Sequence, residues 1–299
     1  MEIGMVGLGK MGYPLALNMK DHGHRVVAYS RSAEKASGFT ADGLEGTADL
    51  AGFSRFLRNP RLIWLMVPAG EPVDKIIEQL VPLLERGDII VDGGNSHYRD
   101  SVRRASELQE RGIKYVDAGI SGGPSGARSG ACMMIGADQE TFDYLEPLFK
   151  DLSLKNGCLR VGPSGAGHYV KMVHNGIEYG MMQAIAEGFE LMASGPYELD
   201  YQALAELWNN GSVIRSWLIE LTANIFAGDP QLEQIKGVAG SSGTGRWTVE
   251  EALAMKVPVP VIAQALFARY HSEQEESFSA KLIAGLRREF GGHDIEKPD

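Results

Sequence analysis

Four polar residues with helical spacing are the feature of this sequence most suited to chemistry. The positions i, i+3, i+4 and i+7 are occupied by Lys171, His174, Asn175 and Glu178. On a helix this spacing places an amine, an imidazole, a carboxamide and a carboxyl group on one face, while Met172, Val173 and Ile177 point elsewhere and can pack. Such a set can move protons on a polar anionic substrate. A solvated helix face with an ordinary Lys/Glu pair explains the same spacing equally well.

The composition limits the kinds of protein that this chain can be. Its 299 residues suffice for two domains, and 44% hydrophobic with 23% charged residues is typical of a globular protein. The formal charge of −10 argues against a nucleic-acid partner and means that an anionic ligand needs a locally basic pocket. No apolar run approaches the roughly 18 residues of a membrane span, so we expect no membrane partner.

Cysteine usage and the N-terminus indicate the compartment. Cys132 and Cys158 show neither the spacing of metal ligands nor a disulfide framework, which is typical of a reducing cytoplasm. The N-terminus opens directly into a strand pattern, without a basic targeting segment. We therefore expect a cytoplasmic protein that binds no metal.

Short β-type runs alternate with helical patterns through the first half of the chain. The predicted strands cover residues 2–6, 25–29, 62–66, 89–92, 115–117, 133–135 and 159–161. The predicted helices between them include 11–22, 73–85 and 101–111. This alternation predicts an α/β domain with a mainly parallel, doubly wound sheet over residues 1–165.

The sequence changes character after the break Gly162-Pro163-Ser164-Gly165. Residues 166–299 are predicted to form an all-α C-terminal domain, whose first helix, 167–193, carries the four polar residues. Further helices are predicted at 200–209, 213–227, 249–256, 259–273 and 278–290, with a glycine- and serine-rich loop at 237–245.

The turn after the first predicted strand has the pattern GxGxxG of Rossmann-type, dinucleotide-binding domains. Its residues are Gly7, Leu8, Gly9, Lys10, Met11 and Gly12. The first two glycines permit the tight turn and the close approach of the backbone to a pyrophosphate at the helix N-terminus. Because the pattern follows a strand and opens a helix, we predict a cofactor site in preference to a glycine turn without a ligand.

The end of the second strand indicates which cofactor binds. NAD-binding domains usually place an acidic residue there for the ribose 2′-hydroxyl, whereas this chain has Ser30, Arg31 and Ser32. Two hydroxyls and a guanidinium suit a 2′-phosphate, so the sequence predicts NADP, with NAD as the alternative. An ordinary surface arginine would explain Arg31 taken alone.

Two more loops follow strand ends, where open α/β sheets bind ligands. Asp92-Gly93-Gly94-Asn95-Ser96 ends one strand, and Ser121-Gly122-Gly123 lies just after the strand that begins at Tyr115. Each could be a plain glycine turn if considered alone.

Taken together, these segments give the chain a resemblance to the 6-phosphogluconate dehydrogenase (decarboxylating) family, from residue 1 almost to the end. The segments that carry it are 7–12, 92–96, 121–123 with 126–128, 171–180, 243–248, 267–269 and 290–293. The wider β-hydroxyacid dehydrogenase superfamily shares the glycine loop and a lysine with an asparagine four residues later. The pair His174-Asn175 followed by Glu178-Tyr179 is more specific to the phosphogluconate enzymes, and the length matches their short form.

The resemblance implies a role for each polar group. Lys171 would be the general base for the 3-hydroxyl and would then stabilise the developing enolate, and Glu178 would protonate C1 of the enediol. Hydroxyls of the substrate would be held by Asn95, His174 and Asn175. The substrate carboxylate end would bind to Ser121, Gly122 and Gly123, while Asn95 and Val67 would also lie near the cofactor.

The resemblance also implies a phosphate site and a homodimer. Tyr179 and Arg269 match family phosphate-binding residues, and Arg287 and His293 lie in a tail that would complete the site of the neighbouring subunit. Residues 166–299 would thus serve both substrate binding and dimerisation. A helix C-terminal arginine favoured by the helix dipole is the alternative for Arg287.

Two departures from the family pattern concern anion binding. Ser242 and Pro68 stand where long forms of the family have lysines, near the substrate phosphate and the cofactor respectively. Arg246 is a candidate to replace the first lysine.

Two other functions are compatible with parts of the pattern. A superfamily reductase of a small β-hydroxyacid or its semialdehyde would need Lys171 but no second acid such as Glu178. A nucleotide-binding sensor would need neither. The presence of both groups on one predicted helix face favours decarboxylation.

Overall fold

The computed structural model describes residues 1–241 and 243–296. The chain forms two compact units, Met1–His174 and Asn175–Asp299, and the division falls inside the long helix α8, Ala166–Ala193. The domain boundary predicted at 165/166 coincides with the start of α8.

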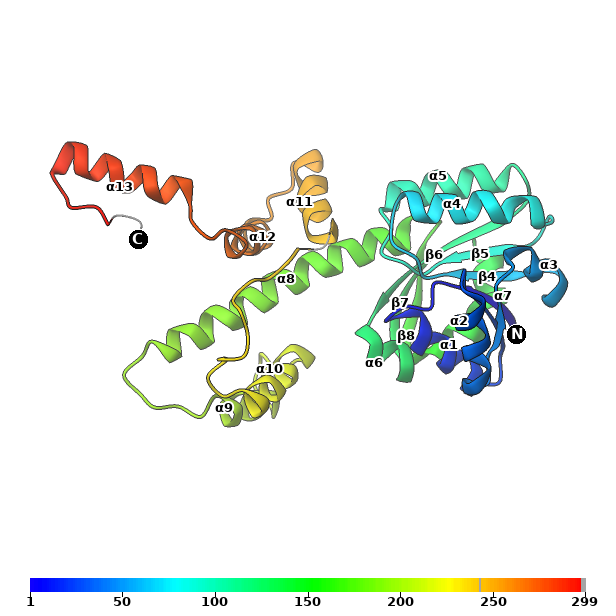
Figure 1. Cartoon of the computed structure of the whole chain (residues 1–299), viewed down its shortest axis with the longest axis horizontal. Helices are drawn as coiled ribbons and strands as arrows, with labels where there is room; N and C mark the ends of the chain where they lie inside the picture. Colours follow the sequence, from blue (N-terminus) through cyan, green and yellow to red (C-terminus); the bar gives the residue numbers. More distant parts are fainter. Residues whose placement is uncertain (242, 297–299) are drawn as a thin grey trace. The chain divides into compact units, whose positions relative to one another are not determined.

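An eight-stranded sheet forms the centre of the unit Met1–His174 (Figure 1), in the order β3-β2-β1-β4-β5-β6-β7-β8. Its strands are β1 Glu2–Val6, β2 Arg25–Tyr29, β3 Glu45–Thr47, β4 Leu62–Leu65, β5 Ile89–Asp92, β6 Lys114–Ser121, β7 Ala131–Gly136 and β8 Ser153–Gly162. All neighbours pair in parallel except β6 and β7, which are antiparallel. The predicted mainly parallel, doubly wound sheet is therefore confirmed.

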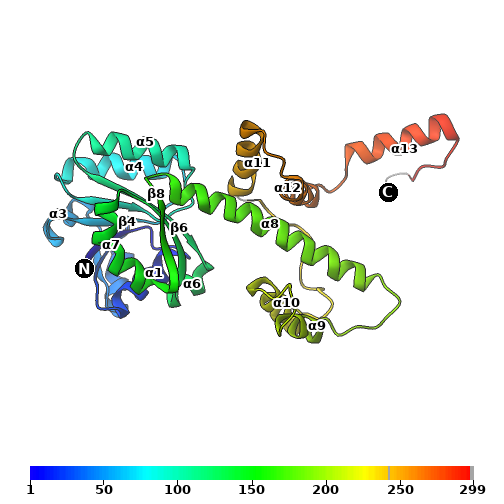
Figure 2. The ribbon, with the colours of Figure 1, turned by 180° about the vertical axis from the view of Figure 1, so that it is seen from behind.

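Helices cover both faces of this sheet (Figures 1 and 2). On one face α1 Gly12–Asp21, α6 Gly123–Ser129 and α7 Gln139–Leu152 contribute to a buried cluster that includes Leu15, Trp64 and Phe149. On the other face α3 Phe53–Phe56, α4 Glu71–Leu80 and α5 Tyr98–Gln109 contribute to a second cluster with Val73 and Ile90. The apolar strands are buried from both sides, as expected of parallel sheets.

Short helices complete this unit: α2 Ala33–Gly38, and three 3₁₀ turns at Phe39–Asp42, Leu50–Gly52 and Val81–Leu83.

Two strands of this unit differ from the sequence prediction. Strand β6 continues to Ser121, so this residue ends a strand and only Gly122 separates it from helix α6. Strand β3 was not predicted, because its three residues include a glycine and show no apolar alternation.

The described residues of the unit Asn175–Asp299 form helices joined by loops, without a strand, as predicted. It contains the second half of α8 and then α9 Tyr201–Asn209, α10 Trp217–Gly228, α11 Gly243–Met255, α12 Pro260–Ser272 and α13 Phe278–Gly291. An aromatic cluster joins α8, α9 and α10 through Phe189, Tyr201 and Phe226. Among the described helices, none combines the length and apolar character needed to cross a membrane.

Two helix starts differ from prediction for local reasons. Helix α10 begins after Ser216, whose side chain accepts a hydrogen bond from the backbone N–H of Ile219 and caps the helix, rather than at residue 213. Helix α11 begins at Gly243, inside the predicted loop 237–245.

Candidate active site

The three glycines of the first turn have three different surroundings. Gly7 has φ +98°, and a Cβ there would lie 2.4 Å from the carbonyl oxygen of Met66. At Gly12 a Cβ would lie 2.0 Å from the oxygen of Gly7. At Gly9 a Cβ would meet no described atom within 4 Å. Gly7 and Gly12 are thus required by the fold, whereas the open space at Gly9 is where a pyrophosphate can approach the backbone.

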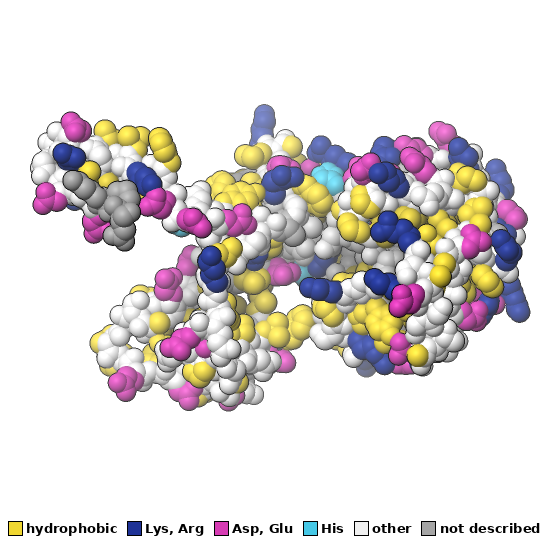
Figure 3. Space-filling model, in the orientation of Figure 1, with side chains coloured by type: hydrophobic (Ala, Val, Ile, Leu, Met, Phe, Trp, Pro, Cys, Tyr) yellow, Lys and Arg dark blue, Asp and Glu magenta, His cyan; other side chains and the backbone are white. Residues whose placement is uncertain are grey.

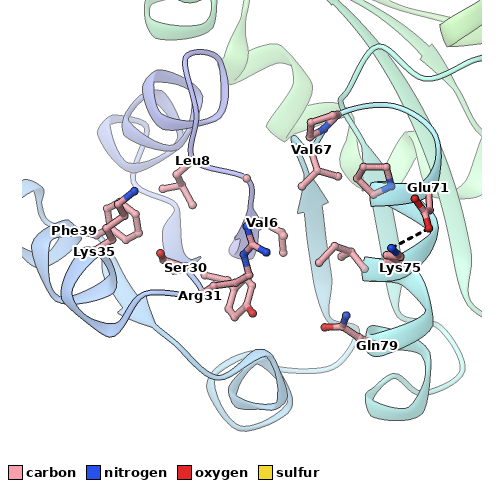
Figure 4. A pocket seen from close by; sticks show the side chains of 15 residues that line it. Val6, Leu8, Ser30, Arg31, Lys35, Phe39, Val67, Glu71, Lys75 and Gln79 are labelled. Carbon is pink, nitrogen blue, oxygen red and sulfur yellow. Dashed lines mark ion pairs between the residues drawn. The ribbon is translucent and has the colours of Figure 1, made fainter.

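A cavity of about 620 Å³ lies beside this turn (Figure 4). Of the predicted cofactor residues, its lining includes Gly7, Leu8, Ser30, Arg31 and Val67. The others lie outside its lining: Gly9, Lys10, Met11, Gly12, Ser32 and Asn95. Pro68, one of the departures from the family pattern, also lines the cavity.

Cations occupy two walls of the cavity. Arg31 and Lys35 come from the end of β2 and the start of α2, and Lys75 of α4 lies across from them (Figure 4). Lys75 pairs with Glu71 at 2.8 Å. Lys35 was missed from the sequence. A signal for it in the sequence is Ser32, whose hydroxyl caps α2 by accepting a hydrogen bond from the N–H of Lys35. This cap fixes the start of the helix and places Lys35 in its first turn.

These residues fit an NAD(P) cofactor. The bare backbone at Gly9 suits a pyrophosphate, the cavity has the size of a ligand site, and two cations, Arg31 and Lys35, line it.

Asp117 of β6 holds the N-terminus of helix α8. Its carboxylate accepts hydrogen bonds from the backbone N–H groups of Gly165, at 2.5 Å, and His168, at 2.8 Å. Burial raises the pKa of this carboxyl, although the two N–H groups and His168 oppose the rise. A helix N-terminus favours a negative charge at this position. Asp117 thereby fixes the first turn of the helix that carries Lys171.

Helix α8 crosses strand β6 at a glycine. A Cβ at Gly119 would lie 2.4 Å from the Cβ of Lys171, so only glycine lets the lysine stem lie against the strand. Lys171 is buried, with 6% of its surface exposed.

The imidazole of His174 lies between Lys171 and Ser121. Nζ of Lys171 is 3.4 Å from Nδ1 of His174, and Oγ of Ser121 is 3.2 Å from Nε2. Three predicted site residues, from β6 and α8, are therefore connected within Met1–His174. Gly122, with φ +129°, and Gly123, with φ +60°, follow Ser121 and open helix α6.

The loop after β5 presents Asn95 to solvent between two fixed neighbours. Asn95 is exposed, while Ser96 is buried and donates a hydrogen bond to Asp92 at 2.7 Å. The N–H of Gly94 also donates to Asp92, at 3.0 Å. The backbone at Asn95 is thus held at the carboxyl end of the sheet by the residues on either side.

The remaining site residues belong to Asn175–Asp299. Asn175 donates a hydrogen bond to Oγ1 of Thr244 at 3.0 Å, and both side chains are buried. Tyr179 is buried under Arg269, whose guanidinium carbon lies 3.6 Å from the ring centroid. Thr244 is a further residue that the sequence did not single out, since a lone threonine in a glycine-rich segment gives no signal.

Glycines again allow this packing. A Cβ at Gly176 would lie 2.7 Å from the side chain of Thr248, and one at Gly245 would lie 2.3 Å from the Tyr179 ring. Helix α11 therefore packs directly on α8 from its first turn, which explains why residues 243–245 are helical.

The predicted polar face lies on one unbroken helix, since α8 includes all of Lys171, His174, Asn175 and Glu178. Glu178 is partly buried. Ile177, predicted to pack, is instead 52% exposed in the single chain, so that prediction is wrong here.

The structure also locates the residues of the predicted tail and of the predicted phosphate site. Arg287 and His293 are exposed. Arg246 pairs with Glu250 along its own helix at 3.3 Å. Ser242 lies outside the described residues. The described residues contain no group of three His, Cys, Asp or Glu side chains arranged for a metal ion.

Comparison with known proteins decides the family. Residues 2–162 match the model of the NAD binding domain of 6-phosphogluconate dehydrogenase, and residues 167–285 match the model of its C-terminal domain. The chain belongs to the 6-phosphogluconate dehydrogenase family. This confirms the resemblance inferred from the motifs.

Two full-length relatives illustrate the membership. A protein of Bacillus subtilis (strain 168), named as a candidate 6-phosphogluconate dehydrogenase, is 50% identical over 99% of this chain and 100% of its own length. The NAD(+)-dependent, decarboxylating 6-phosphogluconate dehydrogenase of Haloferax volcanii is 44% identical over the whole of both chains.

Solved structures agree with this family. The Plasmodium falciparum 6-phosphogluconate dehydrogenase, studied in complexes with NADP+ and with its substrate 6-phosphogluconate, gives a TM-score of 0.84 at 34% identity and covers 100% of this chain and 67% of its own. A Mycobacterium tuberculosis 3-hydroxyisobutyrate dehydrogenase gives 0.71 at 20% identity over 96% and 99% of the two chains, which shows a shared fold alone.

Proposed function

We propose that this chain catalyses the oxidative decarboxylation of 6-phosphogluconate to ribulose 5-phosphate and CO2, with NADP as the oxidant, in the pentose phosphate pathway. The observation that carries the proposal is the presence of Lys171, His174, Asn175 and Glu178 on one helix of a chain that belongs to this family. A reductase of small β-hydroxyacids is the alternative.

Lys171 takes the proton of the substrate 3-hydroxyl. The buried amine lies 3.4 Å from His174, which holds it in place and is itself in contact with Ser121. Bound NADP supplies the acceptor for the hydride that leaves C3. The protonated lysine then stabilises the negative charge that develops on O3 when the bond between C1 and C2 breaks and CO2 leaves.

Glu178 completes the reaction by giving a proton to C1 of the enediol, the carbon that was C2 of 6-phosphogluconate before CO2 left. It lies seven residues after Lys171, two turns further along the same helix. A simple hydride transfer needs no such second group. For this reason Glu178 distinguishes decarboxylation from the reductase alternative.

Polar groups at both ends hold the substrate. Ser121, Gly122 and Gly123 bind the carboxylate end, and Asn95, His174 and Asn175 hold hydroxyls. The phosphate binds at Tyr179 and Arg269, where the guanidinium is held over the ring and by the carbonyl of Gly240 at 2.9 Å. A guanidinium fixed in this way can offer its remaining N–H groups to a phosphate.

NADP is favoured over NAD by the residues at the end of β2. The cavity is lined by both Arg31 and Lys35, and there is no carboxylate among Ser30, Arg31 and Ser32 to repel a 2′-phosphate. The pyrophosphate binds across the turn Gly7–Gly12, which includes Leu8, Lys10 and Met11. The Haloferax volcanii relative is named as NAD(+)-dependent, so the preference for NADP or NAD differs between members of the family.

A homodimer in which Arg287 and His293 complete the neighbouring site is part of the proposal. Helix α13 carries Phe278, Leu282, Ile283, Leu286 and Phe290 exposed along its length, and Figure 3 shows hydrophobic side chains gathered on it. None of its described residues is buried. An apolar helix without a covering partner in its own chain suits a second copy of the chain.

The domain boundary and the compartment complete the proposal. We place the boundary at 165/166, between the residues matched by the two family models. Two free cysteines suit the reducing cytoplasm.

A substrate panel tests the proposed function. Initial rates of nicotinamide reduction would be measured with 6-phosphogluconate, gluconate and 3-hydroxyisobutyrate, each with NADP and with NAD. We expect turnover with 6-phosphogluconate and a higher kcat/KM with NADP. Preferential turnover of 3-hydroxyisobutyrate would show the reductase alternative to be right.

A further inference from the structure

Arg104 is a buried arginine that is not among the residues proposed to bind cofactor or substrate. It belongs to helix α5, and 1% of its surface is exposed. A buried guanidinium is costly unless all its N–H groups find acceptors. Its partners therefore indicate what the residue is for.

The guanidinium hydrogen-bonds to both loops that follow the central strands β4 and β5. From the loop after β4, the carbonyl of Gly70 accepts from Nη2 at 3.1 Å. From the loop after β5, Oγ of Ser96 accepts from Nη1 at 3.3 Å, and Asp92 lies 3.4 Å from the same nitrogen. Nε donates to Asp74 of α4 at 2.8 Å.

The two loops also touch each other directly. A Cβ at Gly94 would lie 2.9 Å from the carbonyl oxygen of Val67, and one at Gly93 would lie 2.7 Å from the sulfur of Met66. Gly70 has φ +83°, a conformation that glycine adopts without strain. The loops are thus closely packed, with glycines of the second loop against Met66 and Val67 of the first, and Arg104 links them from within the protein.

These loops carry residues with proposed roles at the reacting end of the cofactor. Val67 and Pro68 line the cavity, and Asn95 is exposed at the tip of the second loop, next to Ser96. Asp92 also accepts hydrogen bonds from the hydroxyls of Ser96, at 2.7 Å, and Tyr115, at 3.0 Å. The arginine and the aspartate therefore fix the backbone on one side of Asn95.

We infer that Arg104 is a positioning residue, which sets the loop carrying Val67 and the loop carrying Asn95 in register for hydride transfer. The inference rests on the proposed function. Arg104 acts through these loops and needs no contact with substrate. The adenosine end of the cofactor, at Ser30, Arg31 and Lys35, lies on a different loop, to which Arg104 makes none of the hydrogen bonds described above.

The test uses the full-length protein and two variants of neighbouring arginines. Arg104→Lys keeps the positive charge but cannot serve acceptors on both loops at once. Arg103→Gln is the matched control, because Arg103 contacts the same oxygen of Asp74, at 2.9 Å, but is 44% exposed in its side chain and contacts neither loop. Dissociation constants would be measured for NADP and for 2′,5′-ADP, together with kcat and KM.

For Arg104→Lys we expect kcat to fall and the NADP dissociation constant to rise, each on the order of 10- to 100-fold, with 2′,5′-ADP binding within about twofold of native. Arg103→Gln should leave all four values within about twofold. Equal losses for NADP and 2′,5′-ADP would show that Arg104 supports only the general fold. Unchanged kcat and NADP binding in Arg104→Lys would also overturn the inference.

Two further measurements keep the test decisive. If Arg104→Lys does not fold, Ser96→Ala removes one acceptor on the second loop, and the same pattern, smaller in size, is expected; native values would contradict the inference. The binding constants need no turnover. A protein that binds NADP normally but does not oxidise 6-phosphogluconate would thus disprove the proposed function while still testing Arg104.

Discussion

Proton transfer in this site depends on single side chains, and Glu178 is the one that distinguishes the candidate reactions. Lys171 and Glu178 lie two turns apart on one helix, so each can be changed without altering the other. A group that protonates carbon is needed only if CO2 leaves. The acid is therefore the residue whose removal gives the most specific result.

Glu178→Gln should lower the rate of ribulose 5-phosphate formation by roughly 10²- to 10⁴-fold, because a carboxamide cannot donate the proton to C1. Product would be measured directly, alongside the NADP dissociation constant as a control for correct folding. Near-native product formation in this variant would show that Glu178 is not the acid.

Arg31→Ala should raise the KM for NADP by about 10- to 100-fold, since a charge-assisted contact to the 2′-phosphate would be lost. The KM for NAD, which has no such phosphate, should change little and serves as the internal control. Equal effects on both cofactors would contradict the 2′-phosphate assignment.

At the scale of elements, the first βα turn separates the needs of the fold from those of the ligand. Gly7→Ala should lower the free energy of unfolding by about 1–3 kcal/mol, because φ is positive and the Met66 carbonyl is in the way. Gly9→Ala should leave unfolding unchanged yet weaken NADP binding by roughly tenfold or more. Thermal unfolding and NADP titration of both variants check this. A destabilised Gly9→Ala protein with native affinity would be inconsistent with a pyrophosphate at that position.

The two cysteines report on the strands β7 and β8. Cys132 is exposed, whereas burial raises the pKa of Cys158 to about 11. At about pH 8 only roughly one Cys158 thiol in a thousand is ionised, and the thiolate is the reactive form. Ellman's reagent should therefore label Cys132 rapidly and Cys158 slowly, with the slow phase accelerating as pH rises toward the pKa. Cys132→Ser should remove the fast phase; its persistence would show that Cys158 is accessible and would contradict its burial.

Elements with regular apolar patterns were predictable, and glycine-rich starts were not. Strands β1, β2 and β5 were predicted to the residue, because each is a short apolar run beside a turn, and α8 to within one residue, because its polar residues recur with helical spacing. The start of α11 depends on Gly245 packing against Tyr179, a contact between distant residues. No local pattern encodes such a contact.

The same distinction applies to the candidate site. Lys171, His174 and Ser121 were predicted from spacing and family motifs, and the structure connects them. Thr244 and Arg104 were missed, because their importance lies in partners far away in sequence. An isolated threonine or arginine gives no periodic signal.

At the scale of the whole molecule, the tail decides whether one subunit can work alone. A chain with Lys171→Ala would be mixed, after joint refolding, with a chain carrying Arg287→Ala and His293→Ala. If the tail acts on the neighbouring subunit, a mixed dimer has one complete site. Random pairing in a two-fold dimer should then restore about one quarter of native activity. Each variant alone should be nearly inactive, and an inactive mixture would place the tail in its own subunit.

The central claim is that this molecule couples oxidation to decarboxylation. The most direct test follows NADPH formation and CO2 release together, with 6-phosphogluconate labelled by ¹⁴C at C1. We expect one labelled CO2 for each NADPH formed, with ribulose 5-phosphate as the other product. NADPH formation without labelled CO2, or no NADPH formation from 6-phosphogluconate at all, would contradict it.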